Sequence, residues 1–385
     1  RLVSTSAALV THNVKYVRIR VDGASCDSVQ LGPVLRAVKF GNANNGGVVG
    51  DSGTLLTTTN KGVNWTAASS GTTENLNAIN FPGASAGWAV GSGGKVLKTT
   101  NLTQWASVTS GTTQKLDATY FTGTNNGWIV GDGGTIRKTT NGTSFSAQTS
   151  GTSSNLNGIH MTTASNGIVV GDGGIVLRTT TGGTSWLVQT SGTTRNLRGI
   201  FFSSATAGIA VGDSGTILKT SNSGGTWTAV TSGTLRNLTG VFLTPQNMGF
   251  ISGEGGTLLT STDGTIWISR VTGTSLNLYG VAWTTNNSGG VVVGNKGSVS
   301  IASTEAAWTF RPFGTKLFDV SLTYKYFTPN VSHTLTMDAV DTLSGTLRGY
   351  QAVKTVLLAP GKDTTVTPNS SLAQCGYGGA TPACN

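Results

Sequence analysis

Residues 130–142 read Val-Gly-Asp-Gly-Gly-Thr-Ile-Arg-Lys-Thr-Thr-Asn-Gly. A short apolar approach leads into a glycine-rich turn, an alternating run follows it, and a second polar turn ends the stretch. This order is typical of a β-hairpin followed by the start of another turn. A Gly-Asp-Gly-Gly run also resembles a phosphate cradle, but no helix follows it to supply the N–H groups that a phosphate needs. The stretch recurs along the chain, so we interpret it as a repeated structural hairpin.

The glycine before the turn marks each copy of this repeat. Seven copies follow one another at intervals of 40 or 41 residues. The marker residues are Gly50, Gly91, Gly131, Gly171, Gly212, Gly253 and Gly294. A period of roughly 40–50 residues that contains only short strands predicts a β-propeller.

Each copy divides into four strand-like pieces, which we name a, b, c and d in chain order. In the fifth copy they cover residues 197–202, 208–211, 216–220 and 227–230. Four strands make one propeller blade. The sequence therefore predicts an all-β fold with a seven-bladed propeller of four-stranded blades over residues 34–312. Because every blade already has four strands, we expect the ring to close by side-chain packing between the first and seventh blades.

An aromatic residue opens strand d in every copy. The set is Trp65, Trp105, Phe145, Trp186, Trp227, Trp267 and Trp308. Each such ring can bury about 150–250 Å². All seven copies keep the ring, whereas a binding site rarely needs sevenfold use. These residues are therefore expected to fill the wedges between neighbouring blades rather than to bind a ligand.

The two flanks, residues 1–33 and 313–385, also show β patterns. Apolar and polar residues alternate in both, for example over 17–21 and 318–326, which favours strands. We predict one small β-sandwich-like accessory domain made by both flanks, with the propeller inserted into it. The alternative, that residues 1–12 and 368–385 are loose tails, stays open at this point.

Three cysteines lie near the chain ends, at Cys26, Cys375 and Cys384. Their placement suits a disulfide formed in an oxidising compartment. Cys375 could pair with Cys384, or either could pair with Cys26 and join the two flanks. The sequence does not choose between these pairings.

Composition suggests an extracytoplasmic protein. Charged residues make up 10% of the chain and the net charge is +10, so the polar surface must be built from Thr, Ser and Asn. The charge is scattered, which argues against a nucleic-acid-binding tail. No apolar run approaches the ~18 residues of a membrane span. We predict no cofactor, no metal and no small-molecule substrate.

Acidic residues recur in the turn between strands b and c, but they belong to different blades. The set is Asp51, Asp132, Asp172, Asp213 and Glu254. Asp and Asn favour such turns because their side chains bond nearby backbone N–H groups. Because carboxylates on separate blades are too far apart to share one ion, no metal site is expected here.

Basic residues suggest a partner-binding surface. Four successive blades carry a cation at one position of strand c, whereas Thr57, Thr260 and Ile301 occupy it elsewhere. The candidate basic stripe, with one adjacent residue, is Lys98, Arg137, Lys138, Arg178 and Lys219. A second basic rim, expected on the opposite side, is Arg195, Arg198 and Arg236. The alternative is that these are ordinary solvated charges at strand ends.

The turn before strand d carries a family resemblance. Ser261-Thr-Asp263-Gly264-Thr-Ile-Trp267 resembles the Asp-box of bacterial neuraminidase repeats, with Asn60, Asn141 or Asn222 near the Asp position in other copies. Because of that resemblance, the sequence must be searched for the catalytic residues of a sialidase. The only glutamates are Glu74, Glu254 and Glu305, and no tyrosine with a neighbouring carboxylate matches the family's nucleophile pair. We therefore predict that the chain is not an enzyme.

The whole repeat, with Thr-Ser-Gly-Thr-x-x-Asn-Leu before each blade, resembles the photosystem II assembly and stability factor family of seven-bladed propellers over residues 34–312. The resemblance implies docking of a protein partner through an arginine-rich patch. Our main prediction is nevertheless a non-enzymatic protein that is secreted or displayed on a surface, such as a filament subunit that self-associates into a homopolymer. The alternative is an assembly factor for a membrane protein complex, in the periplasm or thylakoid lumen. A sialidase-like protein is the remote alternative.

Overall fold

The fold is taken from a computed structural model. It describes residues 33–244, 248–270, 272, 274–284 and 290–295 with their side chains. It further describes backbone strands at residues 2–3, 298–302, 308–312, 319–322, 332–343, 346–357 and 364–365. The chain forms two compact units, one made of residues 33–295 and 300–308 and the other of residues 1–32, 296–299 and 309–385.

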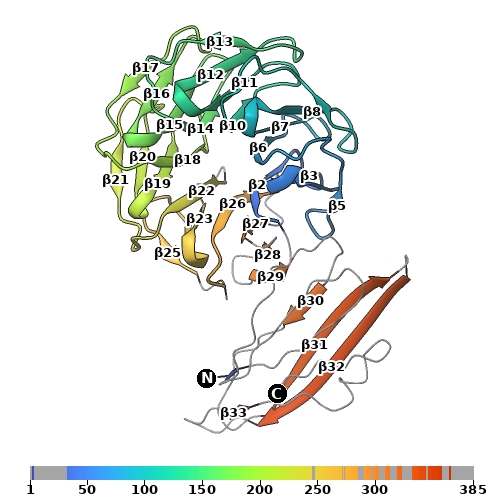
Figure 1. Cartoon of the computed structure of the whole chain (residues 1–385). Coiled ribbons are helices and arrows are strands. Elements are labelled where there is room, and N and C mark those ends of the chain that lie inside the picture. The colour runs from blue at the N-terminus through green and yellow to red at the C-terminus, as the bar shows by residue number, and fades with distance from the viewer. Residues whose placement is uncertain are drawn as a thin grey trace. The chain divides into compact units, whose positions relative to one another are not determined.

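The propeller strands form successive four-stranded sheets, each running in chain order from strand a to strand d (Figure 1). The a strands are β2 (Leu35–Phe40), β6 (Leu76–Asn80), β10 (Leu116–Phe121), β14 (Leu156–Met161), β18 (Leu197–Phe202), β22 (Leu238–Leu243) and β26 (Leu278–Trp283). The b strands are β3 (Gly46–Gly50), β7 (Gly87–Gly91), β11 (Gly127–Gly131), β15 (Gly167–Gly171), β19 (Gly208–Gly212), β23 (Gly249–Gly253) and β27 (Gly290–Gly294). The c strands are β4 (Leu55–Thr58), β8 (Val96–Thr99), β12 (Thr135–Thr139), β16 (Val176–Thr179), β20 (Ile217–Thr220), β24 (Leu258–Ser261) and β28 (Ser298–Ala302). The d strands are β5 (Thr66–Ala67), β9 (Ala106–Ser107), β13 (Ser146–Gln148), β17 (Leu187–Gln189), β21 (Thr228–Val230), β25 (Ile268–Ser269) and β29 (Trp308–Pro312).

The sequence predicts seven blades. Among the residues that are described with side chains, six of these sheets are complete blades. In the remaining sheet, β26 and β27 are described with side chains, and the strand order continues to β28 and β29. The predicted all-β propeller with four-stranded blades is thus confirmed.

The turn that joins strands b and c explains the glycine-rich signature. It is a single 3-10 turn, observed at Asp51–Gly53, Ser92–Gly94, Asp132–Gly134, Asp172–Gly174, Asp213–Gly215 and Glu254–Gly256. Its third residue has a left-handed backbone, with φ 70° at Gly134. A Cβ there would lie 1.9 Å from the carbonyl oxygen of Thr152. Only glycine avoids both the backbone strain and this clash.

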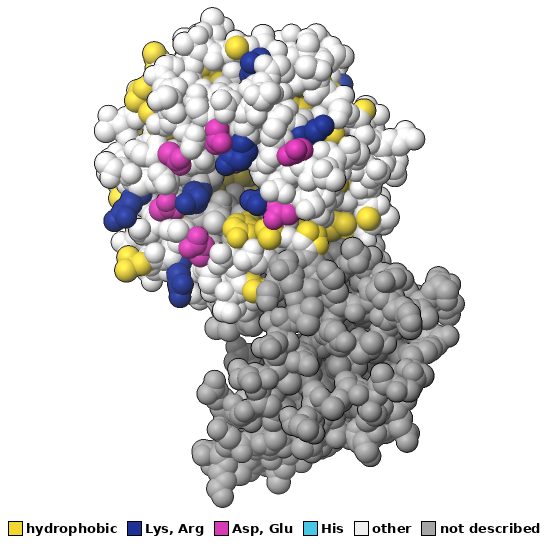
Figure 2. Space-filling view, in the orientation of Figure 1, with side chains coloured by type: hydrophobic (Ala, Val, Ile, Leu, Met, Phe, Trp, Pro, Cys, Tyr) yellow, Lys and Arg dark blue, Asp and Glu magenta, His cyan; other side chains and the backbone are white. Residues whose placement is uncertain are grey.

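The ring closes by packing, as the sequence predicts. Strand a of each blade contacts strand a of the next, and β2 contacts both β26 and β27. A Cβ on Gly280 would lie 3.1 Å from the Cα of Ala37, so the first and last inner strands approach at backbone distance. A Cβ on Gly62 would likewise meet Val291 at 3.0 Å. The inner strands therefore surround the centre of the ring, where Figure 2 shows the face of the propeller hollowed. We call this centre of the ring the central channel.

The aromatic residues that open strand d fill the wedges between blades, which confirms that prediction for the described residues. Trp186 packs with Trp128 and Val130 of the preceding blade. Phe145 stands edge-on to Trp88 of the preceding blade, with ring centroids 6.0 Å apart. Equivalent clusters hold Trp105, Trp227 and Trp267. These rings therefore form the hydrophobic core between blades rather than a ligand site.

The second unit contains one strand within the predicted stretch 318–326, whereas the predicted strand at 17–21 lies outside the described residues. β30 (Asp319–Leu322), β31 (Ser332–Leu343) and β32 (Thr346–Leu357) form one antiparallel sheet. β1 (Leu2–Val3) pairs in parallel with β33 (Thr364–Thr365), so one strand of each flank meets the other. The β-sandwich itself remains a prediction, and all three cysteines lie outside the described residues. No helix in the described part of the chain is long and apolar enough to cross a membrane.

Candidate docking rim

The turns between strands b and c share one face of the propeller with the loops from strand d to strand a. Strand a begins at this face, because Leu35 pairs with Gly50 beside the b–c turn while Phe40 pairs with Gly46 at the other end. Figure 2 shows acidic and basic side chains alternating around the hollow at the centre of one face. We call the b–c turns, the d–a loops and the first residues of strand a the rim.

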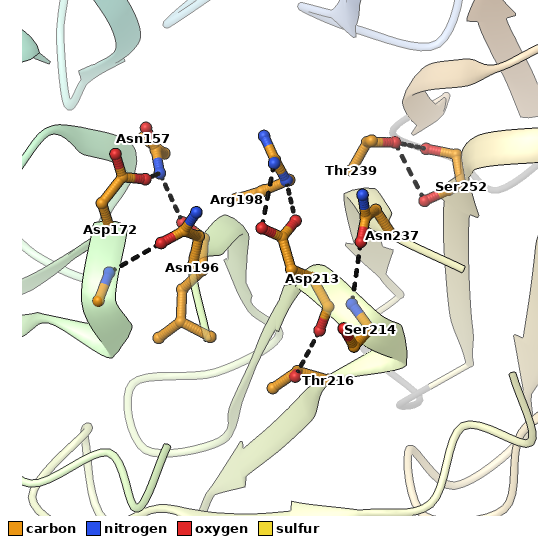
Figure 3. Close-up of polar contacts among 12 residues, drawn as sticks. Asn157, Asp172, Asn196, Arg198, Asp213, Ser214, Thr216, Asn237, Thr239 and Ser252 are labelled. Atoms are coloured by element: carbon orange, nitrogen blue, oxygen red, sulfur yellow. Dashed lines mark hydrogen bonds and ion pairs between the residues drawn. The ribbon is translucent and has the colours of Figure 1, made fainter. Parts of the chain in front are cut away.

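Asparagines before strand a attach each turn of the rim to its neighbour. The Oδ1 atom of Asn196 accepts the N–H of Gly173 at 2.9 Å, and Asn237 Oδ1 accepts the N–H of Ser214 at 2.9 Å (Figure 3). In each case the side chain reaches from one blade to the turn of the preceding blade. The recurrent Asn-Leu pair of the sequence is therefore an inter-blade link.

The carboxylates of the rim are held by the second residue of strand a in the same blade. Arg198 forms an ion pair with Asp213, and its Nη2 atom donates to Asp213 Oδ2 at 3.1 Å (Figure 3). Asn157 Nδ2 donates to Asp172 Oδ1 at 2.8 Å. Arg36 pairs with Asp51 in the first blade. These turn carboxylates therefore take part in local structure.

The third blade departs from this pattern, because Lys115 stands where most other blades have asparagine. Its Nζ lies 3.1 Å from Asp117 Oδ1 and 3.6 Å from Asp132 Oδ1. Burial raises the pKa of Asp117, although the adjacent Lys115 opposes that shift. The described residues contain no group of three or more side chains that could hold a metal ion.

The second basic rim of the sequence prediction does lie on this face. Arg198 is exposed but committed to Asp213, whose hydrogen bond raises the pKa of the guanidinium. Arg195 and Arg236 are exposed, and within the described chain neither guanidinium has a hydrogen bond or ion pair. Leu235, beside Arg236, is 87% exposed. The rim from the fourth to the sixth blade thus combines two uncommitted cations with an apolar side chain.

The first basic stripe lies toward the opposite face, and its cations form hydrogen bonds between neighbouring blades. Each reaches the turn between strands c and d of the next blade. Lys138 Nζ donates to Gly182 O at 2.9 Å and lies 5.0 Å from the ring centroid of Trp128. The corresponding contacts join Lys98 to Gly142 O at 3.3 Å, Arg178 to Ser223 O at 3.0 Å and Lys219 to Asp263 O at 3.1 Å. Docking of a partner through the stripe stays a prediction.

Arg137 belongs to the other side of the same sheet. Its Nη1 atom lies 2.8 Å from where a Cβ on Gly111 would be. Gly111 follows strand d of the second blade, whereas Lys138 contacts the fourth blade. The structure therefore does not bring Arg137 together with the other four cations.

Replacing Lys138 with methionine is expected to lower the free energy of unfolding by about 1–2 kcal/mol, because it leaves the Gly182 carbonyl without its charged donor. Denaturation in urea, followed by far-UV circular dichroism, measures this change. Lys61→Asn, at an exposed turn residue with φ 66°, controls for the lost charge, because asparagine tolerates that backbone. An unchanged midpoint in Lys138→Met would contradict the inter-blade role.

The Asp-box also has a structural role. Asp263 Oδ1 accepts the N–H groups of Thr265 at 2.7 Å and Ile266 at 3.0 Å. These bonds lower the pKa of Asp263. Asn141 makes the same bonds to Thr143 and Ser144. The motif therefore stabilises a turn, and asparagine replaces aspartate because only the accepting oxygen is needed.

The fold and rim define a β-propeller with a charged polar face, and known propellers share this fold. The solved structure of YCF48 bound to D1 peptide is 19% identical, covers 74% of this chain and 97% of that chain, and has a TM-score of 0.60. YCF48 from Cyanidioschyzon merolae is 20% identical over 71% of this chain and 96% of that chain, with a TM-score of 0.58. The WD40 propeller domain of Doa1 is 11% identical over 72% and 95%, with a TM-score of 0.59. At these identities the similarity shows the fold alone.

A family model matches part of the chain and indicates which type of propeller it resembles. The model described as photosynthesis system II assembly factor YCF48 matches residues 99–240. The resemblance proposed from the repeat is therefore confirmed. No curated protein matches the chain in sequence.

The main functional prediction, a surface-displayed or filament-forming protein, is wrong. The match to the assembly factor model favours the alternative of an assembly factor. The prediction relied on low charge and a Thr, Ser and Asn surface, which a propeller can have whatever its partner. Nothing in these matches supports a homopolymer.

Proposed function

We propose that this chain is a non-enzymatic docking protein of the photosystem II assembly factor type, which binds a protein partner during assembly of a membrane complex. The observation that carries this proposal is the match of residues 99–240 to the assembly factor model. That segment runs from the end of β8 to β22 and contains the rim residues Arg195, Arg198, Leu235 and Arg236. An oxidising, extracytoplasmic compartment such as the thylakoid lumen suits the cysteines and the low charge.

The docking surface is the rim around Arg195, Arg198, Leu235 and Arg236. Exposed guanidinium groups without partners can form charge-assisted hydrogen bonds with carboxylates. An exposed leucine beside them can pack against an apolar side chain. The surface therefore suits an extended segment that carries both acidic and apolar residues. One solved relative is titled as bound to a D1 peptide, which supports a peptide as the ligand here.

The architecture of the proposal has seven blades and an accessory domain. The strand order β26-β27-β28-β29 supports a seventh blade. The pairing of β1 with β33 supports an accessory domain made by both flanks. We assign residues 34–312 to the propeller, and 1–33 with 313–385 to the accessory part.

Reversing both free cations, in Arg195→Glu/Arg236→Glu, is expected to weaken peptide binding about tenfold or more, because like charges then face the acidic ligand. Fluorescence anisotropy with labelled peptides that tile the D1 protein measures the affinity. Lys61→Asn, which removes a cation on the opposite face, should bind as the wild type does. Equal affinity in the wild type and the double variant would refute docking at this rim.

A further inference from the structure

The fifth residue of each a strand forms a ring around the central channel. This ring is Lys39, Asn80, Tyr120, His160, Phe201, Phe242 and Ala282. Three successive ring contacts make an aromatic arc: Tyr120 to His160 at 4.6 Å, His160 to Phe201 at 4.9 Å, and Phe201 to Phe242 at 4.8 Å between centroids. One side of the channel is therefore a continuous wall of rings.

Lys39 crosses the channel toward that wall. Its Nζ lies 4.9 Å from the centroid of Phe201, although β2 and β18 belong to the first and fifth blades. The side chain is half-buried and so keeps contact with the channel interior. The ammonium thus projects into the channel rather than into a blade.

Among the residues described with side chains, this ammonium has no anionic partner. It makes no hydrogen bond or ion pair there, it lies over the Phe201 ring, and its charge acts on His160. The only carboxylate on an a strand is Asp117, whose partner is Lys115. His160 and Tyr120 are the titratable neighbours in the ring, and both are neutral at pH 7.

The described loops at the end of the channel near Lys39 are uncharged. The described loops between strands a and b cover residues 41–45, 81–86, 122–126, 162–166 and 203–207. None of these segments contains Asp, Glu, Lys, Arg or His. Among the described residues, Lys39 therefore lies behind uncharged loops, in contrast to the alternating charges of the rim.

A hydrogen-bond donor stands in the same ring. His160 Nδ1 accepts the N–H of Phe202 at 3.4 Å, which places the proton of the neutral imidazole on Nε2. Nε2 faces the Tyr120 hydroxyl at 3.5 Å, so that hydroxyl accepts from His160. The Tyr120 O–H proton then remains available to a ligand in the channel.

We propose that the channel around Lys39 binds one small monovalent anion, either an inorganic ion or a carboxylate. A charge enclosed without a counter-ion is costly, and an anion beside the ammonium offsets that cost. Burial lowers the pKa of Lys39 to about 8, so the group still carries its charge at pH 7. Among the described residues, the aromatic edges and the uncharged loops provide no second cation, which disfavours multivalent anions and favours weakly hydrated ones.

The test is thermal unfolding of the full chain at pH 7 and constant ionic strength, with chloride, nitrate, formate or benzoate replacing gluconate. Binding to the native state should raise the wild-type Tm saturably, by about 2–4 °C. Lys39→Met should abolish the rise, and Lys61→Asn should retain it. A preference for chloride and nitrate identifies an inorganic ligand, whereas a preference for formate or benzoate identifies a carboxylate. An equal rise in Lys39→Met, or no saturable rise in the wild type, overturns the proposal.

A second measurement does not depend on the variant. Crystals of the wild type grown or soaked in bromide should show an anomalous peak in contact with Lys39 Nζ. Crystals soaked in gluconate alone should lack it. A wild-type channel without bromide at Lys39, in a protein that also shows no saturable rise in Tm, would exclude the site.

Discussion

Replacing Trp128 with alanine is expected to lower the free energy of unfolding by about 3–5 kcal/mol, the range typical of a buried aromatic residue changed to alanine. The Trp128 side chain is fully buried and packs with Leu156 and Trp186 of the next blade. Its Nε1–H donates to Gly182 O at 3.2 Å, the same carbonyl that Lys138 binds. The variant thus loses core packing and one of two donors at a single inter-blade contact.

Two further variants separate packing from hydrogen bonding. Trp128→Phe keeps most of the ring but removes the donor, so a loss of about 1–2 kcal/mol is expected. Leu187→Ala changes a residue that is 65% exposed and should stay within about 0.5 kcal/mol of the wild type. Urea denaturation followed by far-UV circular dichroism avoids the loss of the tryptophan signal. A loss below about 1 kcal/mol in Trp128→Ala would show that this wedge does not stabilise the ring.

The repeat made the fold predictable because one blade is a local unit. Its turns need glycine where a Cβ would clash, as at Gly134, and its wedge needs a ring, as at Trp186. Both requirements recur once a blade, so they appear in the sequence as a period.

The role of the basic stripe was not predictable from composition alone. Lys98 and Lys138 look like solvated charges, yet each donates to a carbonyl 44 residues further along the chain. A signal was present, because that separation is one repeat plus a few residues and recurs in consecutive blades. A side chain that contacts the next blade is therefore separated from its partner in the sequence by slightly more than one repeat.

The residues of the rim could be predicted from the sequence, whereas those of the channel ring could not. Arg195 and Arg236 were predicted as a rim because they share a loop position. Lys39 was missed, because its repeat equivalents include Asn80, His160 and Phe201, which share no chemistry. Only the circular arrangement brings such different residues together. The resemblance to the assembly factor family was recognised from the whole repeat rather than from any one residue.

His160 should make the protein sensitive to acid. Burial, and then the charge of Lys39, lower the pKa of His160 from 6.5 to about 3. Between these two values the unfolded chain binds more protons than the folded one, so stability falls as pH falls below 6.5. One pH unit within this window corresponds to about 1.4 kcal/mol. The expected loss from His160 at pH 5, relative to pH 7.5, is therefore about 2 kcal/mol.

The propeller itself suggests the variant that tests this expectation. Asn80 occupies the same position two blades earlier, and its Oδ1 accepts the N–H of Phe121 at 3.1 Å, just as His160 Nδ1 accepts that of Phe202. His160→Asn should keep the inter-blade hydrogen bond but lose the titration, so urea midpoints at pH 5 and 7.5 should differ by about 2 kcal/mol less than in the wild type. Tyr120→Phe, which leaves the imidazole buried, should retain the acid-induced loss. An identical pH profile for His160→Asn and the wild type would contradict the assignment of the acid-induced loss to His160.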